Sequence, residues 1–258
     1  MDFCEHKHTK NLFLGGLLEL RQSKHGYRAG MDAVLLASIC PARSNENIID
    51  LGAGVGTVGL CVAARLQKNN ERLKKLILVE KEEEICLLAK ENCIHNQIEA
   101  DIIHADIYGS IAEKEGAGLK PGQAHHIVMN PPYYSMQTHL AAKNDYKSQA
   151  HMVQEAESIE SWIKTSCWLL KAKGSLSLIY PVQSLELILS ALKGRFGAIK
   201  ILSLASSQEK AAKRVLIQAT RDSAAPLSLL PPLIIHEDNG NYTPKVEAIL
   251  RQGDILSL

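Results

Sequence analysis

The sequence lacks the features that mark several classes of protein. Its 29 Lys and Arg residues nearly balance its 28 Asp and Glu residues, for a formal net charge of +1. No global charge therefore points to nucleic acid, although a local basic patch is still compatible with it. Apolar runs are short and interrupted by charge, which argues against a membrane-spanning helix. No apolar core follows the polar first 11 residues, so we expect no secretion signal.

The six cysteines form no recognisable framework. No two stand in a CxxC spacing, and no set of Cys and His residues has the spacing of a zinc site. Most lie among apolar residues, where a free cysteine packs as a small hydrophobic side chain. Scattered, reduced thiols suit the cytosol, so we expect a cytoplasmic protein that holds no metal.

The remaining composition is that of an ordinary globular chain. Hydrophobic residues make up 46% and charged residues 22% of the 258 positions, enough for one sizeable core. Short apolar runs alternate with helical patterns, which predicts a doubly wound α/β sheet with helices on both faces. The runs at 199–204 and 215–220 are joined by too short a segment for a crossover. They predict an antiparallel pair that closes the sheet.

The pattern predicts a single domain with a core at 46–222, an N-terminal cover at 1–45 and a C-terminal extension at 223–258. We expect the segment 135–157 to be a long polar loop that could order as a lid. The other expected strands are 47–51, 76–80, 101–104, 126–130 and 176–180; the expected helices are 57–67, 83–96, 158–170 and 183–192, with a weak one in 111–123.

A glycine-rich loop, Asp50-Leu51-Gly52-Ala53-Gly54-Val55-Gly56, follows the first of these strands. Its glycines permit positive φ and close approach of a ligand to the backbone. The loop has two functional interpretations. Residues 54–59 match the dinucleotide fingerprint GxGxxG, whereas Asp50, Gly52, Gly54 and Gly56 match the S-adenosylmethionine loop [DE]xGxGxG. Asp50 favours the second, because a carboxylate suits the cofactor's ammonium group and would repel a pyrophosphate.

Two more acidic residues end neighbouring strands. Glu80 ends the second strand, where its carboxylate can accept hydrogen bonds from ribose hydroxyls in either interpretation. Asp106 follows the third strand and, in the S-adenosylmethionine interpretation, accepts a hydrogen bond from the adenine amino group. The alternative role for Asp106 is a helix N-cap.

Asn130-Pro131-Pro132-Tyr133, the candidate catalytic tetrad, follows the fourth strand at the same sheet edge. An exocyclic amine on a heteroaromatic ring is a poor nucleophile. The Asn130 side-chain oxygen and the Pro131 carbonyl can accept its two hydrogens and favour the positively charged nitrogen of the transition state. The prolines stiffen the carbonyl, and Tyr133 can stack on a flipped-out base.

Together the glycine loop and the tetrad resemble class I methyltransferases that modify planar nitrogens. Residues 22–37 (QSKHGYRAGMDAVLLA) further resemble the N-terminal signature of the bacterial family that methylates the 6-amino group of an adenine beside the anticodon of a valine tRNA. Residues 236–244 (HEDNGNYTP) resemble its C-terminal end. The resemblance implies a Rossmann-like fold, S-adenosylmethionine as cofactor and tRNA as substrate. In one departure, Tyr134 follows the tetrad where the family usually has Phe.

The resemblance also implies roles for residues of the cover. Gln22, Tyr27, Arg28 and Asp32 would lie near the cofactor and the acceptor, with Tyr27 and Asp32 assigned to the cofactor; the alternative is a packed helical cap with solvated charges. Tyr134 would contact the substrate. Basic residues would dock phosphates, so salt would weaken binding. The candidate RNA contacts, each of which could instead be a solvated charge, are Lys7, Lys10, Arg21, Lys24, Arg28, Lys143 and Lys147.

Four functions compete on this evidence. The first is methylation of a tRNA adenine, and the second is methylation of a protein glutamine amide, which the tetrad serves equally well. The third is methylation of an rRNA guanine amino group. The fourth, from another class, is an NAD-dependent reductase or a non-catalytic nucleotide-binding module, against which Asp50 and the tetrad argue.

Overall fold

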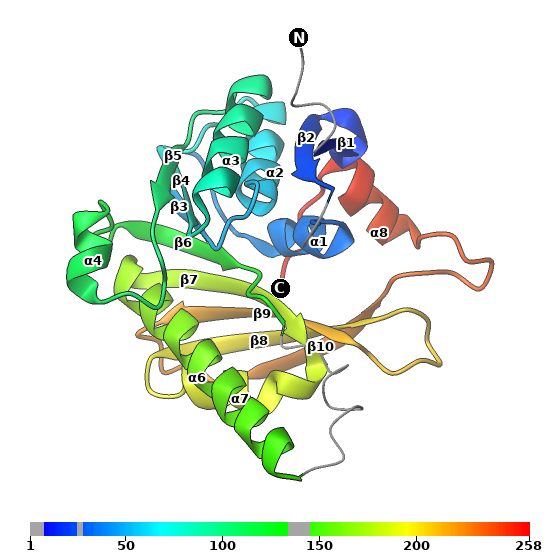
Figure 1. Ribbon diagram of the computed structural model, residues 1–258. Helices are drawn as coiled ribbons and strands as arrows, with labels where there is room; N and C mark the ends of the chain where they lie inside the picture. The colour runs from blue at the N-terminus through cyan, green and yellow to red at the C-terminus, as the bar shows by residue number, and fades with distance from the viewer. Residues whose placement is uncertain (1–7, 25–27, 134–144) are drawn as a thin grey trace.

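An eight-stranded sheet forms the middle of the molecule (Figure 1). The computed structural model describes residues 8–24, 28–133 and 145–258, with the backbone alone at 145–152. The strand order is β10-β8-β9-β7-β6-β3-β4-β5. The bounds are β3 Asn47–Leu51, β4 Lys75–Glu80, β5 Asp101–His104, β6 Ala124–Met129, β7 Leu170–Pro181, β8 Phe196–Ala205, β9 Arg214–Arg221 and β10 Ser228–Ile234.

Only β9 runs against its neighbours in this sheet. It pairs antiparallel with β7 and β8, whereas the other described pairs, β10–β8 included, are parallel. The predicted fold class, a mostly parallel α/β sheet with an antiparallel pair, is therefore confirmed. The antiparallel pair does not end the sheet, because β10 from the expected extension adds a further strand beside β8 (Figure 1).

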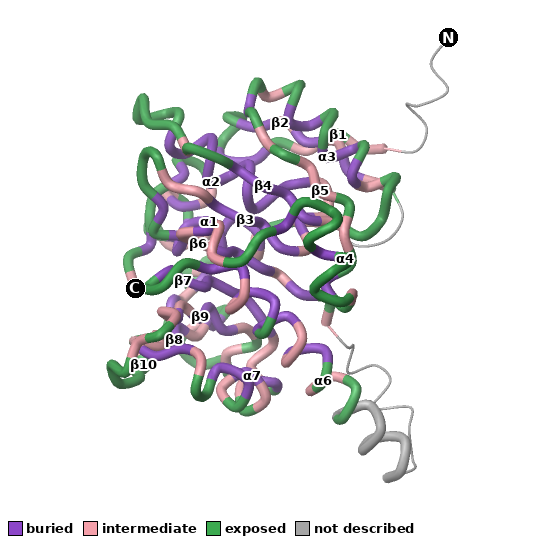
Figure 2. Tube along the Cα trace, turned by 90° about the vertical axis from the view of Figure 1, so that its left-hand side faces the viewer, coloured by how far each residue is buried: buried purple, intermediate pink, exposed green. Residues whose placement is uncertain are grey.

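Side chains of successive strand residues enter different cores, as the pleat of a strand requires. Ile48 and Leu78 belong to one buried cluster, and their neighbours Ile49 and Val79 belong to the other. The first cluster holds residues of α1 (Met31–Ile39), α2 (Thr57–Lys68) and α3 (Glu83–His95); the second holds residues of α6 (Asp145–Leu169) and α7 (Leu185–Leu192). The sheet is thus covered on both faces, and buried residues run through its centre (Figure 2).

The shorter elements lie mainly at the periphery. A capped helix, α4 (Ile111–Gly116), precedes β6, and a short 3-10 turn, η2 (Val182–Ser184), follows β7. The chain ends in α8 (Pro244–Glu247) and a π-helical turn, η3 (Ala248–Gln252). In the described part of the chain, no helix is long and apolar enough to cross a membrane.

A hairpin that the sequence pattern does not predict precedes α1. Its strands β1 (His8–Phe13) and β2 (Leu18–Ser23) are joined by the turn η1 (Leu14–Gly16). Asn92 of α3 and Asn96, the residue that follows this helix, bind the edge of β2 that faces away from β1. The Asn92 amide bonds both backbone groups of Arg21 at 2.8 and 3.0 Å, and the Asn96 amide bonds both backbone groups of Glu19 at 3.0 and 2.9 Å.

The polar segment before Ser158 differs from its prediction. Residues 145–157 were expected to be a loop, but α6 begins at Asp145. Residues 153–157 are exposed or half-buried and Ser158 is buried. Because residues 153–157 have no buried face, their sequence lacks the apolar periodicity that predicts a helix.

Candidate active site

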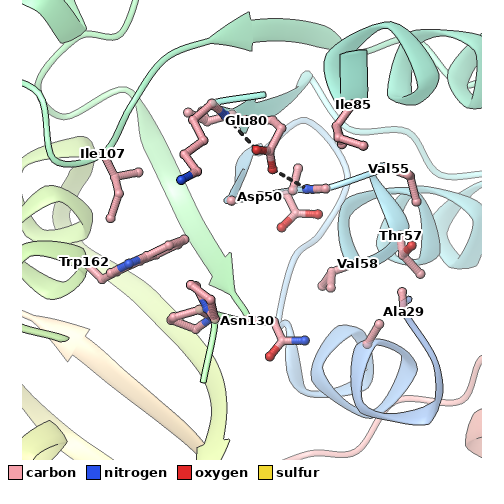
Figure 3. A pocket seen from close by; sticks show the side chains of 18 of the residues that line it. Ala29, Asp50, Val55, Thr57, Val58, Glu80, Ile85, Ile107, Asn130 and Trp162 are labelled. Carbon is pink, nitrogen blue, oxygen red and sulfur yellow. Dashed lines mark hydrogen bonds between the residues drawn. The ribbon is translucent and has the colours of Figure 1, made fainter. Parts of the chain in front are cut away.

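A cavity of about 650 Å³ opens where β3, β4 and β6 end (Figure 3). In Figure 3 the side chains of Asp50, Glu80, Trp162 and Asn130 surround this space from different elements. Carboxyl ends of parallel strands are the usual ligand edge of an open α/β sheet. Of the predicted site residues, Asp50, Gly52, Gly54, Glu80, Asp106, Asn130, Pro131, Pro132 and Tyr133 line the cavity.

Asp50 is the buried acid of this site, with 1% of its surface exposed. Its Oδ2 accepts a hydrogen bond from the Gly59 amide at 2.8 Å, which ties the end of β3 to the first turn of α2. Burial raises the pKa of Asp50 to about 7; the Gly59 hydrogen bond opposes this shift and the charge of Glu80 adds to it. A cationic group in the cavity would therefore stabilise the ionised form of Asp50.

Gly52 and Gly56 are required by close packing at positive φ. Gly52 has a φ of 70°, and a Cβ there would lie 2.3 Å from Cη2 of Trp162. Gly56 has a φ of 88°, does not line the cavity, and leaves room for Leu78, whose Cδ1 would lie 2.9 Å from an added Cβ. Gly52 thus shapes the cavity wall, and Gly56 allows α2 to pack on the sheet.

Backbone amides hold the Glu80 carboxylate at the end of β4. Its Oε2 accepts a hydrogen bond from Gly54 N at 2.9 Å (dashed in Figure 3), and its Oε1 accepts from Lys81 N at 2.8 Å and Glu82 N at 3.1 Å. Hydrogen bonds from three backbone amides hold a carboxylate in a fixed orientation. Glu80 therefore offers the cavity a fixed acceptor for hydroxyl groups.

Asp106 turns the chain after β5. Its Oδ1 accepts a hydrogen bond from Tyr108 N at 2.8 Å. The helix N-cap alternative is wrong, because Ser110 caps α4 with a reciprocal hydrogen-bond pair to Glu113.

A wall that the motifs did not reveal comes from α6 and the loop after β5. The Trp162 Nε1 donates to the Tyr108 hydroxyl at 3.1 Å, and that hydroxyl lies 2.6 Å from Ser158 Oγ. Trp162 and Tyr108 line the cavity beside Asp106 and Ile107. Nothing local in the sequence distinguishes Trp162 from a core residue, because it enters the site only through the packing of α6 against Gly52.

Hydrogen bonds from two tyrosine hydroxyls hold the tetrad in place. The Tyr133 hydroxyl donates to Asn130 Oδ1 at 2.7 Å, and the Tyr180 hydroxyl donates to the Pro132 carbonyl at 3.4 Å. The two tyrosine rings meet edge to face, with centroids 5.2 Å apart. The Arg214 guanidinium lies over the Tyr133 ring, 4.7 Å from its centroid. Tyr180 and Arg214 come from β7 and β9, far from the tetrad in sequence, and no motif pointed to them.

The described residues of the predicted cover are divided between the cavity and its rim. Gln22 is buried and lines the cavity. Its side-chain amide accepts a hydrogen bond from Ala29 N at 2.8 Å and donates one to Ala29 O at 3.2 Å, which joins the end of β2 to the residues just before α1. Arg28 is exposed and donates to Asn11 at 3.1 Å. Asp32 does not line the cavity and pairs with Arg214 at 3.3 Å.

The predicted RNA contacts of the hairpin are partly engaged in ion pairs. Lys10 pairs with Glu19 at 3.6 Å, and Arg21 pairs with Glu91 at 3.4 Å. Lys24 is exposed and does not line the cavity. Lys147 lies in α6. The predicted positions Lys7, Tyr27, Tyr134 and Lys143 lie outside the described residues.

Residues 28–203 match the family model of the methyltransferase small domain. The chain belongs to this family. It is 25% identical over 232 residues to the tRNA1(Val) (adenine(37)-N6)-methyltransferase of Shewanella woodyi, covering 87% of this chain and 91% of the relative. The enzyme of the same name from Flavobacterium johnsoniae is 28% identical over 236 residues, which are 88% of this chain and 92% of that one.

A solved structure supports the same assignment. A protein from Agrobacterium tumefaciens, described as a predicted O-methyltransferase, superposes with a TM-score of 0.72 at 29% identity over 88% of this chain and 99% of its own. This member of the methyltransferase small domain family is therefore an S-adenosylmethionine-dependent methyltransferase with the class I fold, as the sequence predicted.

The chemistry of the cavity fits S-adenosylmethionine. Asp50 is a buried acid of the kind that an ammonium group requires, and the fixed Glu80 carboxylate is an acceptor of the kind that ribose hydroxyls require. Thr57 Oγ1 is buried in the cavity wall with no hydrogen-bond partner in the described part of the chain, so a polar ligand atom could satisfy it. Val58, Ile85 and Ile107 supply apolar surface, as small-molecule sites usually do.

Proposed function

We propose that this methyltransferase transfers the methyl group of S-adenosylmethionine to the exocyclic 6-amino group of an adenine in tRNA. One observation carries the proposal. The Asn130-Pro131-Pro132-Tyr133 segment, held by hydrogen bonds, lies in the same cavity as the acidic side chains of Asp50 and Glu80. The names of the relatives from Shewanella woodyi and Flavobacterium johnsoniae support tRNA and the adenine 6-amino group.

The chain's own groups have defined tasks in this reaction. When bound, the cofactor supplies a methyl group on a positively charged sulfur. Asn130 Oδ1 and the Pro131 carbonyl accept the amine hydrogens and stabilise the charge that grows on nitrogen during transfer. Because the amine proton becomes acidic after transfer, no strong general base is required. Tyr133 contributes a flat surface on which the extruded base can stack.

The Tyr133 hydroxyl has a second task, since it donates to the same Asn130 oxygen. That hydrogen bond orients the amide so that oxygen, rather than nitrogen, is presented as the acceptor. An incoming amine must share this oxygen with the Tyr133 hydroxyl or displace it. Arrival of the base and correct orientation of Asn130 are therefore coupled through one side chain.

The deciding experiment measures transfer of tritiated methyl to total tRNA from a strain that lacks this gene. Hydrolysis to nucleosides then identifies the labelled product. We expect the label in 6-methyladenosine with the wild-type protein and none with Asn130→Ala. Asn69→Ala serves as the matched control, because Asn69 is an exposed residue at the end of α2.

The other acceptors are distinct outcomes of the same assay. Parallel reactions contain rRNA and a glutamine-bearing protein such as a translation release factor. Label in a guanine of rRNA or in a glutamine amide, with none in tRNA, would replace the proposed acceptor. Label on a hydroxyl oxygen would show that the tetrad's amine chemistry is not the reaction of this chain.

A further inference from the structure

The Tyr133 ring is held by a chain of contacts that begins outside the cavity. Arg214 lies over the ring at 4.7 Å, and Asp32 pairs with Arg214 Nε at 3.3 Å. Arg214 is the first residue of β9, where it pairs in register with Pro181 at the end of β7. Asp32 lies in the first turn of α1. Contacts of Arg214 therefore connect β7, β9 and α1 to Tyr133, although these elements are far apart in sequence.

We propose that Arg214 is a positioning residue for the acceptor base, and that Asp32 acts through Arg214 and not on the cofactor. The inference rests on the proposed function for its choice of acceptor. Arg214 and Asp32 do not line the cavity, whereas Tyr133 does. Arg214 and Asp32 can therefore act on the contents of the cavity only through a residue that lines it, and Tyr133 is such a residue.

The physical basis is the attraction between a cation and the face of an aromatic ring. The guanidinium holds the ring on one face and Tyr180 meets it edge to face, so the ring plane is restrained before the base arrives. The Tyr133 hydroxyl is fixed to Asn130 by the same restraint. A tilt of the ring would move both the stacking surface and the amide that receives the amine.

Asp32 contributes by fixing the direction of the guanidinium. The side chains of Arg214 and Asp32 are 34% and 27% exposed, so the ion pair itself is partly screened by water. Its contribution to stability is therefore small, and its main effect is on geometry. Arg214 also donates to the carbonyl of its neighbour Lys213 at 3.3 Å, which further limits its rotamers.

The test compares Arg214→Met, Arg214→Lys and Asp32→Asn in steady-state methylation of tRNA and in cofactor binding by calorimetry. We expect Arg214→Met to lower kcat/KM for tRNA roughly tenfold and to leave the Kd for S-adenosylmethionine within about twofold of wild type. Arg214→Lys keeps the cation and should recover part of the loss. Asp32→Asn should lose less, and the double variant Asp32→Asn/Arg214→Met should be no worse than Arg214→Met alone.

A second ion pair provides the control. Arg251 pairs with Glu247 at the same 3.3 Å distance, and neither residue lines the cavity, so Arg251→Met removes an ion pair of the same length from a more exposed site. Wild-type kcat/KM in Arg214→Met, or an equal loss in Arg251→Met, would overturn the proposal. So would weaker cofactor binding by Asp32→Asn with unchanged acceptor kinetics, because Asp32 would then serve the cofactor.

The design separates this proposal from the choice of acceptor. If the wild-type protein modifies a glutamine amide and not tRNA, the proposed function fails. The same variants are then measured on the glutamine substrate, where a selective loss in Arg214→Met supports the positioning role and its absence overturns it.

Discussion

The proposed cofactor side of the cavity, around Asp50 and Glu80, and the proposed acceptor side, around Asn130 and Tyr133, are built from different kinds of contact. On the cofactor side, backbone amides of Gly54 and Gly59 bind the Glu80 and Asp50 carboxylates. On the acceptor side, side chains bind one another, as Tyr133 does with Asn130 and Arg214. The first arrangement depends on chain direction and on glycine, whereas the second depends on the identity of several distant side chains.

This difference predicts different responses to mutation. A site formed by backbone amides is lost when the backbone cannot adopt its native conformation, so substitutions that introduce a steric clash should have the largest effect there. A site built from side chains fails when one functional group is removed, with little effect on folding. Each of the following predictions separates the two sides in one measurable quantity.

The largest effect is expected from Asn130→Ala. Removing one preorganised group that stabilises transition-state charge costs about 10²–10³ in rate. We expect a loss of this order in the single-turnover rate of methyl transfer. Calorimetry should give a cofactor Kd within about twofold of wild type. A comparable loss of cofactor affinity would remove the distinction between the two sides at this residue.

Gly52→Ala tests the steric requirement of the cofactor side. The added Cβ would lie 2.3 Å from Trp162 Cη2, and we expect the free energy of unfolding in urea to fall by about 1–3 kcal/mol. Gly194→Ala is the control, because Gly194 has a similar φ of 77° and open space around it. Trp162→Phe should restore part of the stability of Gly52→Ala. Equal losses at Gly52 and Gly194 would show that φ, and not clearance, sets the cost.

The protonation of Asp50 should couple cofactor affinity to pH. Its pKa is about 7 in the free protein, and the ammonium group of the cofactor favours the ionised form. Affinity should therefore rise roughly tenfold from about pH 6 to about pH 8, with proton release in calorimetry across buffers of different ionisation enthalpy. Asp50→Asn should bind more weakly and without this pH dependence. A flat profile in the wild type would separate Asp50 from the ammonium group.

Asp50 should also make the free energy of unfolding depend on pH. Without cofactor, its contribution should fall as pH rises, whereas cofactor affinity should rise. The folded-state pKa of Asp50 lies above its ordinary value of 3.8. Between pH 3.8 and about pH 7, folded chains therefore retain a proton that unfolded chains have already lost. Its contribution to stability is present below 3.8 and is lost as pH rises through about 7. Without cofactor, the unfolding free energy of Asp50→Asn should therefore decline less than that of wild type between about pH 5 and about pH 8.

The smallest effect is expected from Lys24→Ala, at an exposed residue outside the cavity. If Lys24 contacts one phosphate, the slope of log affinity for tRNA against log salt should decrease in magnitude by about one. Lys120→Ala removes another exposed charge, in the loop between α4 and β6, and is the control. Identical salt slopes for the two variants would exclude Lys24 from the RNA path.

The placement of three candidate residues could be predicted from short stretches of sequence. Asp50 and Glu80 lie at the ends of short apolar strands and Asn130 follows one, so parallel pairing brings them to one edge of the sheet. Tyr180 and Arg214 could not be found in this way, because they reach the tetrad only through the neighbouring strands β7 and β9 (Figure 1). Their residue types carry no signal until the topology is known.

The missed strands have specific physical reasons. In β10, Pro231 and Pro232 argue against a strand, but they are tolerated because β10 lies at the sheet edge, where its register is irregular. The hairpin carries a signal in Gly15-Gly16, a pair that commonly joins antiparallel strands. Its second strand pairs with β1 on one edge and binds asparagine side chains on the other, and no strand pattern predicts such a partner.

Asn92 and Asn96 form a clamp on the backbone of β2, and Asn92 also connects the hairpin to the glycine loop. The Asn92 amide that holds Arg21 also donates to the carbonyl of Val55 at 3.1 Å, within the loop itself. The Arg21 amide proton is therefore protected by a helix side chain, and it can exchange with solvent only when this clamp opens. Cofactor binding that steadies the glycine loop should slow hydrogen exchange at Arg21, so this amide reports on the occupancy of a cavity that it does not line.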